Sequence, residues 1–138
     1  MYNNLTHNTG DNQKKSLTNS KKLYYSAAVT TFITGILHLT FVPNVISFSG
    51  YTSLFFLITG IAQLFWAVPI LKRWGNIWYY VGMGGTFILL ALWLITRVPS
   101  NRILNRALPV NDIGIVIEVL QTVFVILCGI IIVTRNRE

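Results

Sequence analysis

Charged residues are scarce in this 138-residue chain and are absent from long stretches of it. Asp, Glu, Lys and Arg together make up 11% of the residues, where a soluble domain carries about 25%. None of these four types occurs in residues 23–71 or 74–96, and residues 113–134 contain one, Glu118. Because about 20 apolar residues suffice to cross the hydrocarbon of a bilayer, these runs exclude a soluble globular domain and indicate membrane spans.

Cysteine and catalytic motifs are almost missing as well. The single cysteine, Cys128, cannot form an intrachain disulfide, and we expect a small buried hydrophobic side chain there. The chain has no H-E-x-x-H motif, phosphate-binding loop, C-x-x-C pair or paired carboxylates. One histidine and one glutamate within the spans are too few for a metal site. We therefore expect no catalytic residues, no metal and no cofactor, which argues against an enzyme without excluding one.

Proline and glycine divide the longest apolar run, residues 23–71, which is too long for one span. Pro43, Asn44 and Gly50 lie near its middle, where a residue without an N–H and a flexible residue favour a break. The sequence therefore predicts an all-α fold, a four-helix transmembrane bundle with short loops. Its spans are residues 23–42, 51–71, 75–96 and 113–134.

The segments outside the spans are polar. Residues 1–22 are asparagine-rich and have no hydrophobic period, which is typical of a disordered tail. Residues 23–134 form a single membrane domain, and residues 135–138 form the C-terminus. In the loop between the third and fourth spans, Ser100 is a plausible N-cap and Pro109 a stop, with apolar and polar faces between them. We predict a short amphipathic helix over residues 100–108, with an irregular loop as the alternative.

The basic residues predict an orientation in the cell membrane. Eight of the eleven would lie on the side of the two termini: Lys14, Lys15, Lys21, Lys22, Lys72, Arg73, Arg135 and Arg137. The other three, in the loop after the third span, are Arg97, Arg102 and Arg106. Because cytoplasmic loops carry an excess of Lys and Arg, we expect both termini in the cytoplasm. Nucleic acid is not an expected partner, since the basic residues gather at span ends rather than on one face.

A repeated seven-residue segment suggests how the spans pack. ITGILHL, residues 33–39, returns as ITGIAQL, residues 58–64. Small residues let membrane helices approach closely, so we interpret the repeat as a packing seam, with the inverted repeat of a transporter as the alternative. The predicted packing residues are Thr34, Gly35, Thr59, Gly60, Gln63, Gly82 and Gly85.

Four polar residues within the spans form a hypothetical outer-leaflet pocket for a small ligand, an ion or a proton: His38, Arg97, Glu118 and Gln121. Charged groups in a span are costly and usually have a partner or a function. The alternative is a structural ion pair between Arg97 and Glu118 that fixes the register of the third and fourth spans.

Two segments carry a resemblance to a known family. LFFLITGIAQLFWAV, residues 54–68, and ALWLITR, residues 91–97, resemble a family of small uncharacterised prokaryotic four-span integral membrane proteins, as do His38 and Leu39 placed before Pro43. The resemblance covers about residues 33–97 and implies the four-span architecture, with pattern positions at His38, Gln63, Trp66, Trp93 and Arg97. The likeness to DoxX-type proteins is more distant and concerns shape alone. The loop NVISFSG lacks the second histidine and the carboxylate that often follow the proline in the family.

Three function classes remain open from the sequence. The leading one is a non-enzymatic accessory or assembly subunit of a membrane complex, because the chain is small, has short loops and lacks motifs. The second is a small oligomeric transporter or channel that uses the outer polar pocket. The third is a membrane-embedded enzyme. The expected partners are the lipid bilayer and either other membrane subunits or further copies of this chain.

Overall fold

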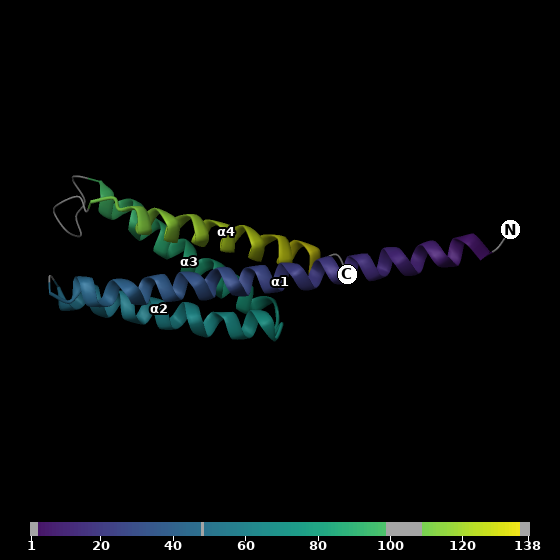
Figure 1. Cartoon of the computed structure of the whole chain (residues 1–138), viewed down its shortest axis with the longest axis horizontal. Coiled ribbons are helices and arrows are strands. Elements are labelled where there is room, and N and C mark those ends of the chain that lie inside the picture. The colour runs from purple at the N-terminus through teal and green to yellow at the C-terminus, as the bar shows by residue number, and fades with distance from the viewer. Residues whose placement is uncertain (1–2, 48, 99–108, 136–138) are drawn as a thin grey trace.

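Four α-helices make up nearly all of the chain that the computed structural model describes. The backbone is described for residues 3–47, 49–98 and 109–135, and the side chains for residue 21 onward within those ranges. The helices are α1, Asn3–Val45; α2, Gly50–Leu71; α3, Asn76–Arg97; and α4, Asp112–Arg135 (Figure 1). No strand occurs in the described ranges, so the predicted all-α fold class is confirmed.

Each helix contains a stretch that is long and apolar enough to cross a membrane. These stretches are Lys21–Val45, Gly50–Leu71, Asn76–Arg97 and Asp112–Arg135. The last three agree with the predicted spans to within one residue at each end. The first extends to Val45 and keeps Pro43 inside its final turns. By the length and composition of its helices, the chain is a multi-pass membrane protein.

The polar N-terminal segment has a helical backbone in the structure, because α1 already begins at Asn3. This segment contains no proline, and it continues a helix whose nucleus lies in the apolar part. Each added residue then forms one hydrogen bond without a new nucleation cost, which favours a helical backbone. In Figure 1 this part of α1 projects well beyond the other three helices. The predicted amphipathic helix over residues 100–108 lies outside the described residues.

The helices run up and down, with α1 at the centre of the arrangement (Figure 1). α1 packs extensively against α2 and also against α4, and α4 packs against α3. α2 and α3 are consecutive but touch far less. We refer to the end with Lys21, the α2–α3 turn and Arg135 as the proximal end, and to the end where α3 finishes and α4 begins as the distal end. The two ends of the membrane domain, at Lys21 and Arg135, therefore lie at the same end of the bundle.

The apolar core lies in the proximal half, where all four helices contribute to it. Its buried members are Tyr24, Ala27, Ala28, Ala67, Ile70, Tyr79, Phe124, Cys128, Ile131 and Ile132. Cys128 is a buried free cysteine, as expected from its place in the fourth span. The core combines small side chains such as Ala27 and Ala67 with large ones such as Tyr79 and Phe124, which lets the helices interdigitate without large voids.

The repeated segments meet where α1 crosses α2. A Cβ atom built on Gly35 would lie 2.9 Å from the carbonyl oxygen of Gly60, and one built on Gly60 would lie 3.0 Å from that of Gly35. Thr31 Oγ1 donates a hydrogen bond to the carbonyl oxygen of Gln63 at 3.2 Å. The two backbones are therefore in contact at a point that a side chain on either glycine would block.

Trp66 joins α2 to α3 in the proximal half. Its Nε1 donates a hydrogen bond to the carbonyl oxygen of Trp78 at 2.9 Å, and a Cβ on Gly82 would overlap its indole ring. Few residues of α3 are buried. Its buried residues are Tyr79, Gly82 and Thr86, and a Cβ on Gly85 would meet nothing within 4 Å.

Candidate polar site between α3 and α4

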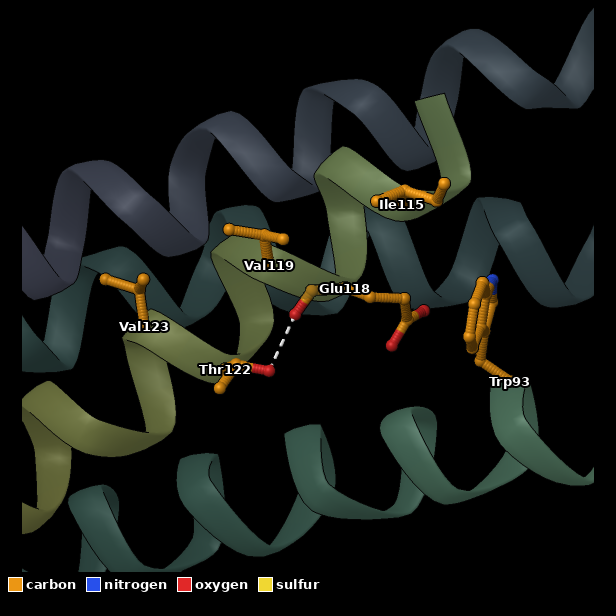
Figure 2. A pocket seen from close by; sticks show the side chains of 6 residues that line it. All are labelled: Trp93, Ile115, Glu118, Val119, Thr122 and Val123. Carbon is orange, nitrogen blue, oxygen red and sulfur yellow. Dashed lines mark hydrogen bonds between the residues drawn. The ribbon is translucent and has the colours of Figure 1, made fainter. Parts of the chain in front are cut away.

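Glu118 lies in the distal half of α4, and its side chain extends towards Trp93 of α3 (Figure 2). Its Oε2 atom is buried and has no hydrogen-bond partner. Thr122 Oγ1 donates a hydrogen bond to the backbone carbonyl of Glu118 at 2.8 Å. The Thr122 hydroxyl therefore does not donate to the Glu118 carboxylate. The carboxylate is therefore an acceptor that the described residues leave unused.

Arg97 forms the last turn of α3, close to Trp93. Its Cζ atom lies 4.6 Å from the centroid of the Trp93 ring, which is within the range of a cation–π contact. Its Nη1 donates to Thr96 Oγ1 at 2.9 Å, whereas its Nε is buried without a partner. The Trp93 indole Nε1 is also buried without a partner. Two unused donors thus lie on α3 beside the unused acceptor on α4.

Arg97 and Glu118 attract each other electrostatically but do not form a close ion pair. The positive charge of Arg97 acts on the Glu118 carboxylate, and the negative charge of Glu118 acts on the Arg97 guanidinium. Within the described ranges no ion pair of 4.0 Å or less joins them. The structural ion pair that the sequence offered as an alternative is therefore not formed in this arrangement.

A cavity of about 270 Å³ borders the carboxylate and is open along one side. Five of its six lining residues come from α4 and one from α3 (Figure 2): Ile115, Glu118, Val119, Thr122, Val123 and Trp93. Apart from Glu118 and Thr122 its walls are largely apolar. The cavity is thus a groove between two helices with one carboxylate set into it.

Gln121 is the most deeply buried member of the predicted set. Its side chain is 1% exposed, and neither its amide nitrogen nor its amide oxygen has a hydrogen-bond partner. It follows Glu118 by three residues on α4, which places the two on adjoining parts of the helix surface. An unpartnered buried amide is costly, so this part of the bundle has polar capacity that no protein group uses.

His38 lies elsewhere, between α1 and α2. It is 4% exposed, its Nδ1 donates a hydrogen bond to the carbonyl oxygen of Thr34 at 3.0 Å, and its ring packs 5.7 Å from that of Phe56. No hydrogen bond or ring contact links it to Arg97, Glu118 or Gln121 in the described part of the chain. Arg97 and Glu118 therefore lie near each other, Gln121 adjoins Glu118 along α4, and His38 lies in a packing position between α1 and α2.

Trp93 is the site residue that sequence reasoning undervalued. The sequence marks it as an aromatic near a span end, which is the usual place for tryptophan in membrane proteins. Its nearness to α4 follows from Gly114, because a Cβ there would lie 3.5 Å from Trp93 Nε1. Asn111 fixes the start of α4 at this point, since its Oδ1 accepts a hydrogen bond from the N–H of Gly114 at 2.6 Å.

In the described ranges no group of three or more His, Cys, Asp and Glu side chains lies together in a way that could hold a metal ion.

No family model matches the chain, and no curated protein or solved structure is significantly similar to it. The candidate site therefore rests on geometry and chemistry, and the resemblance to the four-span family stays an expectation.

Proposed function

We propose that this multi-pass membrane protein binds and releases a proton or a small cation at Glu118 as part of a transport function. The observation that carries this proposal is the buried, unpartnered Oε2 atom of Glu118 beside an arginine that does not pair with it. The sequence alone favoured an accessory role, whereas the geometry favours the second class, a small transporter or channel.

The physical argument concerns the cost of unsatisfied groups in a bilayer. An unpaired polar group in hydrocarbon costs several kcal/mol, roughly, because no water is present to bond it. Glu118, Trp93, Arg97 and Gln121 together hold acceptors and donors that no described residue satisfies. A proton or a cation would satisfy the carboxylate and water would accept from the donors, and intramembrane carboxylates bind protons in pumps and transporters.

Arg97 and Trp93 have distinct parts in this proposal. Arg97 lies near the carboxylate without forming an ion pair with it, so the Oε2 atom of Glu118 stays available to a proton or a cation. The Trp93 ring lies 4.6 Å from Arg97 Cζ and holds the guanidinium beside the site, and this contact leaves the charge of Arg97 in place. One chain offers a groove rather than a pore, so a conducting path would need several copies.

Flux measurements on the purified protein in vesicles test the proposal. A pH gradient across vesicles should collapse faster with the wild-type protein than without it, and Glu118→Gln should return the rate to that of protein-free vesicles. Sodium and potassium gradients, run in parallel, separate proton from cation flux. The matched control is Asp112→Asn, which makes the same chemical change on an exposed residue of the same helix.

Wild-type flux for Asp112→Asn with loss for Glu118→Gln would support the proposal. Wild-type flux for both variants, or no flux for the wild-type protein under any gradient, would overturn it.

The accessory-subunit role is the second candidate, because α3 is the least enclosed helix. Its buried residues are limited to Tyr79, Gly82 and Thr86, and both Gly84 and Gly85 have open space before them. A helix with such a surface can receive another membrane helix closely. Co-purification from native membranes in mild detergent, followed by mass spectrometry, tests this role. A partner that Gly85→Leu releases and Gly129→Leu retains would support it, and purification of the chain alone would count against it.

Cytoplasmic termini in the cell membrane are part of the proposal. Lys21, Lys22, Lys72, Arg73 and Arg135 belong to the proximal end, whereas Arg97 belongs to the distal end. The excess of basic residues favours the proximal end on the cytoplasmic side. Tags on both termini should resist external protease in intact cells and become cleavable after permeabilisation. Cleavage of either tag in intact cells would contradict this orientation.

A further inference from the structure

Two arginines and two tyrosines lie at the proximal end, each from a different part of the fold. Arg73 lies in the α2–α3 turn with its Cζ atom 4.2 Å from the centroid of the Tyr24 ring on α1. The rings of Tyr24 and Tyr79 are 6.0 Å apart, which brings α3 into the cluster. Arg135, in the last turn of α4, and Arg73 both act electrostatically on the Tyr79 hydroxyl. We refer to Tyr24, Arg73, Tyr79 and Arg135 as the proximal cluster.

The proximal cluster holds hydrogen-bond donors without acceptors. Tyr79 is 0% exposed, yet its hydroxyl has no hydrogen-bond partner. The Nη1 atom of Arg135 is also buried without a partner. Buried polar groups in proteins are nearly always bonded, and a buried cation without an acceptor is especially costly. The cluster therefore lacks an acceptor that the described part of the chain does not supply.

The backbone at Arg73 gives independent support for a role of its side chain. Arg73 has φ of 54°, in the left-handed region that side chains rarely adopt. Its N–H bonds to the carbonyl of Ile70 at 3.2 Å and the N–H of Trp74 bonds to that of Pro69 at 3.1 Å, which together form a Schellman motif. Glycine is the usual residue at this position of the motif. An arginine there is locally unfavourable, and such outliers point to function.

The described charged side chains around the cluster are positive. The carboxylates of the described side chains, Asp112 and Glu118, both lie in the distal half. Lys21, Lys22 and Lys72 add further positive charge at the proximal end. Among the described side chains these two guanidiniums and this hydroxyl have no acidic neighbour, which suits a ligand that only accepts hydrogen bonds and carries negative charge. Phosphate has this character, and arginine binds it with two parallel N–H groups.

The position of the cluster identifies the source of the phosphate. It lies where α1 and α4 reach the ends of their membrane-crossing stretches and where α2 turns into α3, which is the level of lipid headgroups. Basic pockets between membrane helices at this level bind the headgroups of anionic lipids. We propose that Arg73 and Arg135 bind the phosphate of an anionic phospholipid at the proximal end, with the Tyr79 hydroxyl as a third donor.

Native mass spectrometry of the full-length protein in detergent tests this site directly. Phosphatidylglycerol and phosphatidylcholine with identical acyl chains serve as the probes. We expect the wild-type protein to retain phosphatidylglycerol in preference to phosphatidylcholine. Arg135→Gln and Arg73→Gly should each weaken phosphatidylglycerol binding about fivefold, the amount expected for one arginine near a membrane surface. Tyr79→Phe should weaken it less.

The control is the double variant Lys21→Gln/Lys22→Gln, which removes two charges from the same end of the bundle outside the cluster. It should leave phosphatidylglycerol binding nearly unchanged. Circular dichroism of every variant checks that the helices remain folded. Arg73→Gly is expected to keep the fold because glycine is the usual residue at this position of the turn.

Three outcomes would overturn the proposal. The first is equal retention of the two lipids by the wild-type protein. The second is an equal loss in the lysine control, which would mean that general positive charge attracts the lipid. The third is a free anion site, which would appear as displacement of phosphatidylglycerol by inorganic phosphate at the same concentration. Flux through Glu118 and lipid retention are measured separately, so either proposal can fail without the other.

Discussion

The proximal and distal halves of this bundle are held together in different ways. In the proximal half, side chains from all four helices form one apolar core, and Trp66 bonds α2 to α3. In the distal half, α3 approaches α4 rather than α2, and Glu118 Oε2, Arg97 Nε and Trp93 Nε1 are buried there without hydrogen-bond partners. Membrane helices that cannot rely on water to drive association pack through close contacts or bonded polar groups. The proximal half has close contacts and the bonded Trp66, with unbonded groups at its outer end, whereas the α3–α4 interface of the distal half has unbonded polar groups within it.

Among the changes that test how the bundle is held together, Gly35→Ala is expected to have the largest effect on the free energy of unfolding. The new Cβ would lie 2.9 Å from the Gly60 carbonyl and from Leu64, so α1 and α2 must separate. Overpacking of this kind costs about 2–3 kcal/mol of the free energy of unfolding. The matched change Gly85→Ala meets nothing within 4 Å and should stabilise its helix by up to about 1 kcal/mol. Unfolding in detergent followed by circular dichroism measures both, and equal effects would refute the close α1–α2 contact.

The second effect has the opposite sign and concerns the distal half. Gln121→Leu removes an amide whose two polar atoms are buried without partners, so the free energy of unfolding should rise by about 1–2 kcal/mol. Gln63→Leu is the comparison, because only one of its amide atoms is in that state. A smaller gain for Gln63→Leu is expected in the same unfolding assay. A loss of stability for Gln121→Leu would mean that its amide is hydrogen-bonded in the membrane.

A third change weakens the link between α2 and α3. Trp66→Phe removes the hydrogen bond to the Trp78 carbonyl and leaves that acceptor with its helical bond, at a cost of about 1 kcal/mol. Trp74→Phe, at an exposed residue in the turn, should change stability by less than about 0.5 kcal/mol. Hydrogen exchange of the first half of α3 gives a local reading. Unchanged protection there in Trp66→Phe would show that the bond does not hold the helices together.

The smallest effect on stability is expected for Arg73→Gly. Relief of the left-handed backbone stabilises the turn by about 1 kcal/mol. Loss of the contact with Tyr24 removes about 0.5–1 kcal/mol, so the two contributions nearly cancel. Thermal unfolding in detergent measures the sum. A marked destabilisation would assign Arg73 to holding the turn rather than to binding a ligand.

The spans of the fold were predictable because hydrocarbon thickness and charge exclusion act on each helix separately. The bounds of α2, α3 and α4 follow from composition to within a residue. The helical backbone of the N-terminal segment did not follow, since its residues have no apolar period and depend on the helix that they continue. Cytoplasmic placement of the termini stays a prediction.

The candidate site was predictable only in part, since a helical pattern tells which residues share a face but not which helices are neighbours. From the sequence, Arg97 and Glu118 can meet only if the third and fourth spans are neighbours. His38 was grouped with them by depth alone, and the structure puts it against Phe56 on α2. The proximal cluster was missed because its key signal, the left-handed backbone of Arg73, arises from a turn that binary hydrophobic patterns do not describe.

The arrangement of α3 has a consequence for the biosynthesis of this chain. The contact between Gly35 and Gly60 can form as soon as α2 has left the ribosome and entered the membrane, because both partners are then present. α3 finds little to hold it at that stage apart from Trp66, and most of its neighbours arrive only with α4. During translation the third helix is therefore in the membrane before the fourth helix is available to pack against it. A pause in translation after residue 97 would lengthen the time in which membrane chaperones or proteases can reach the third helix.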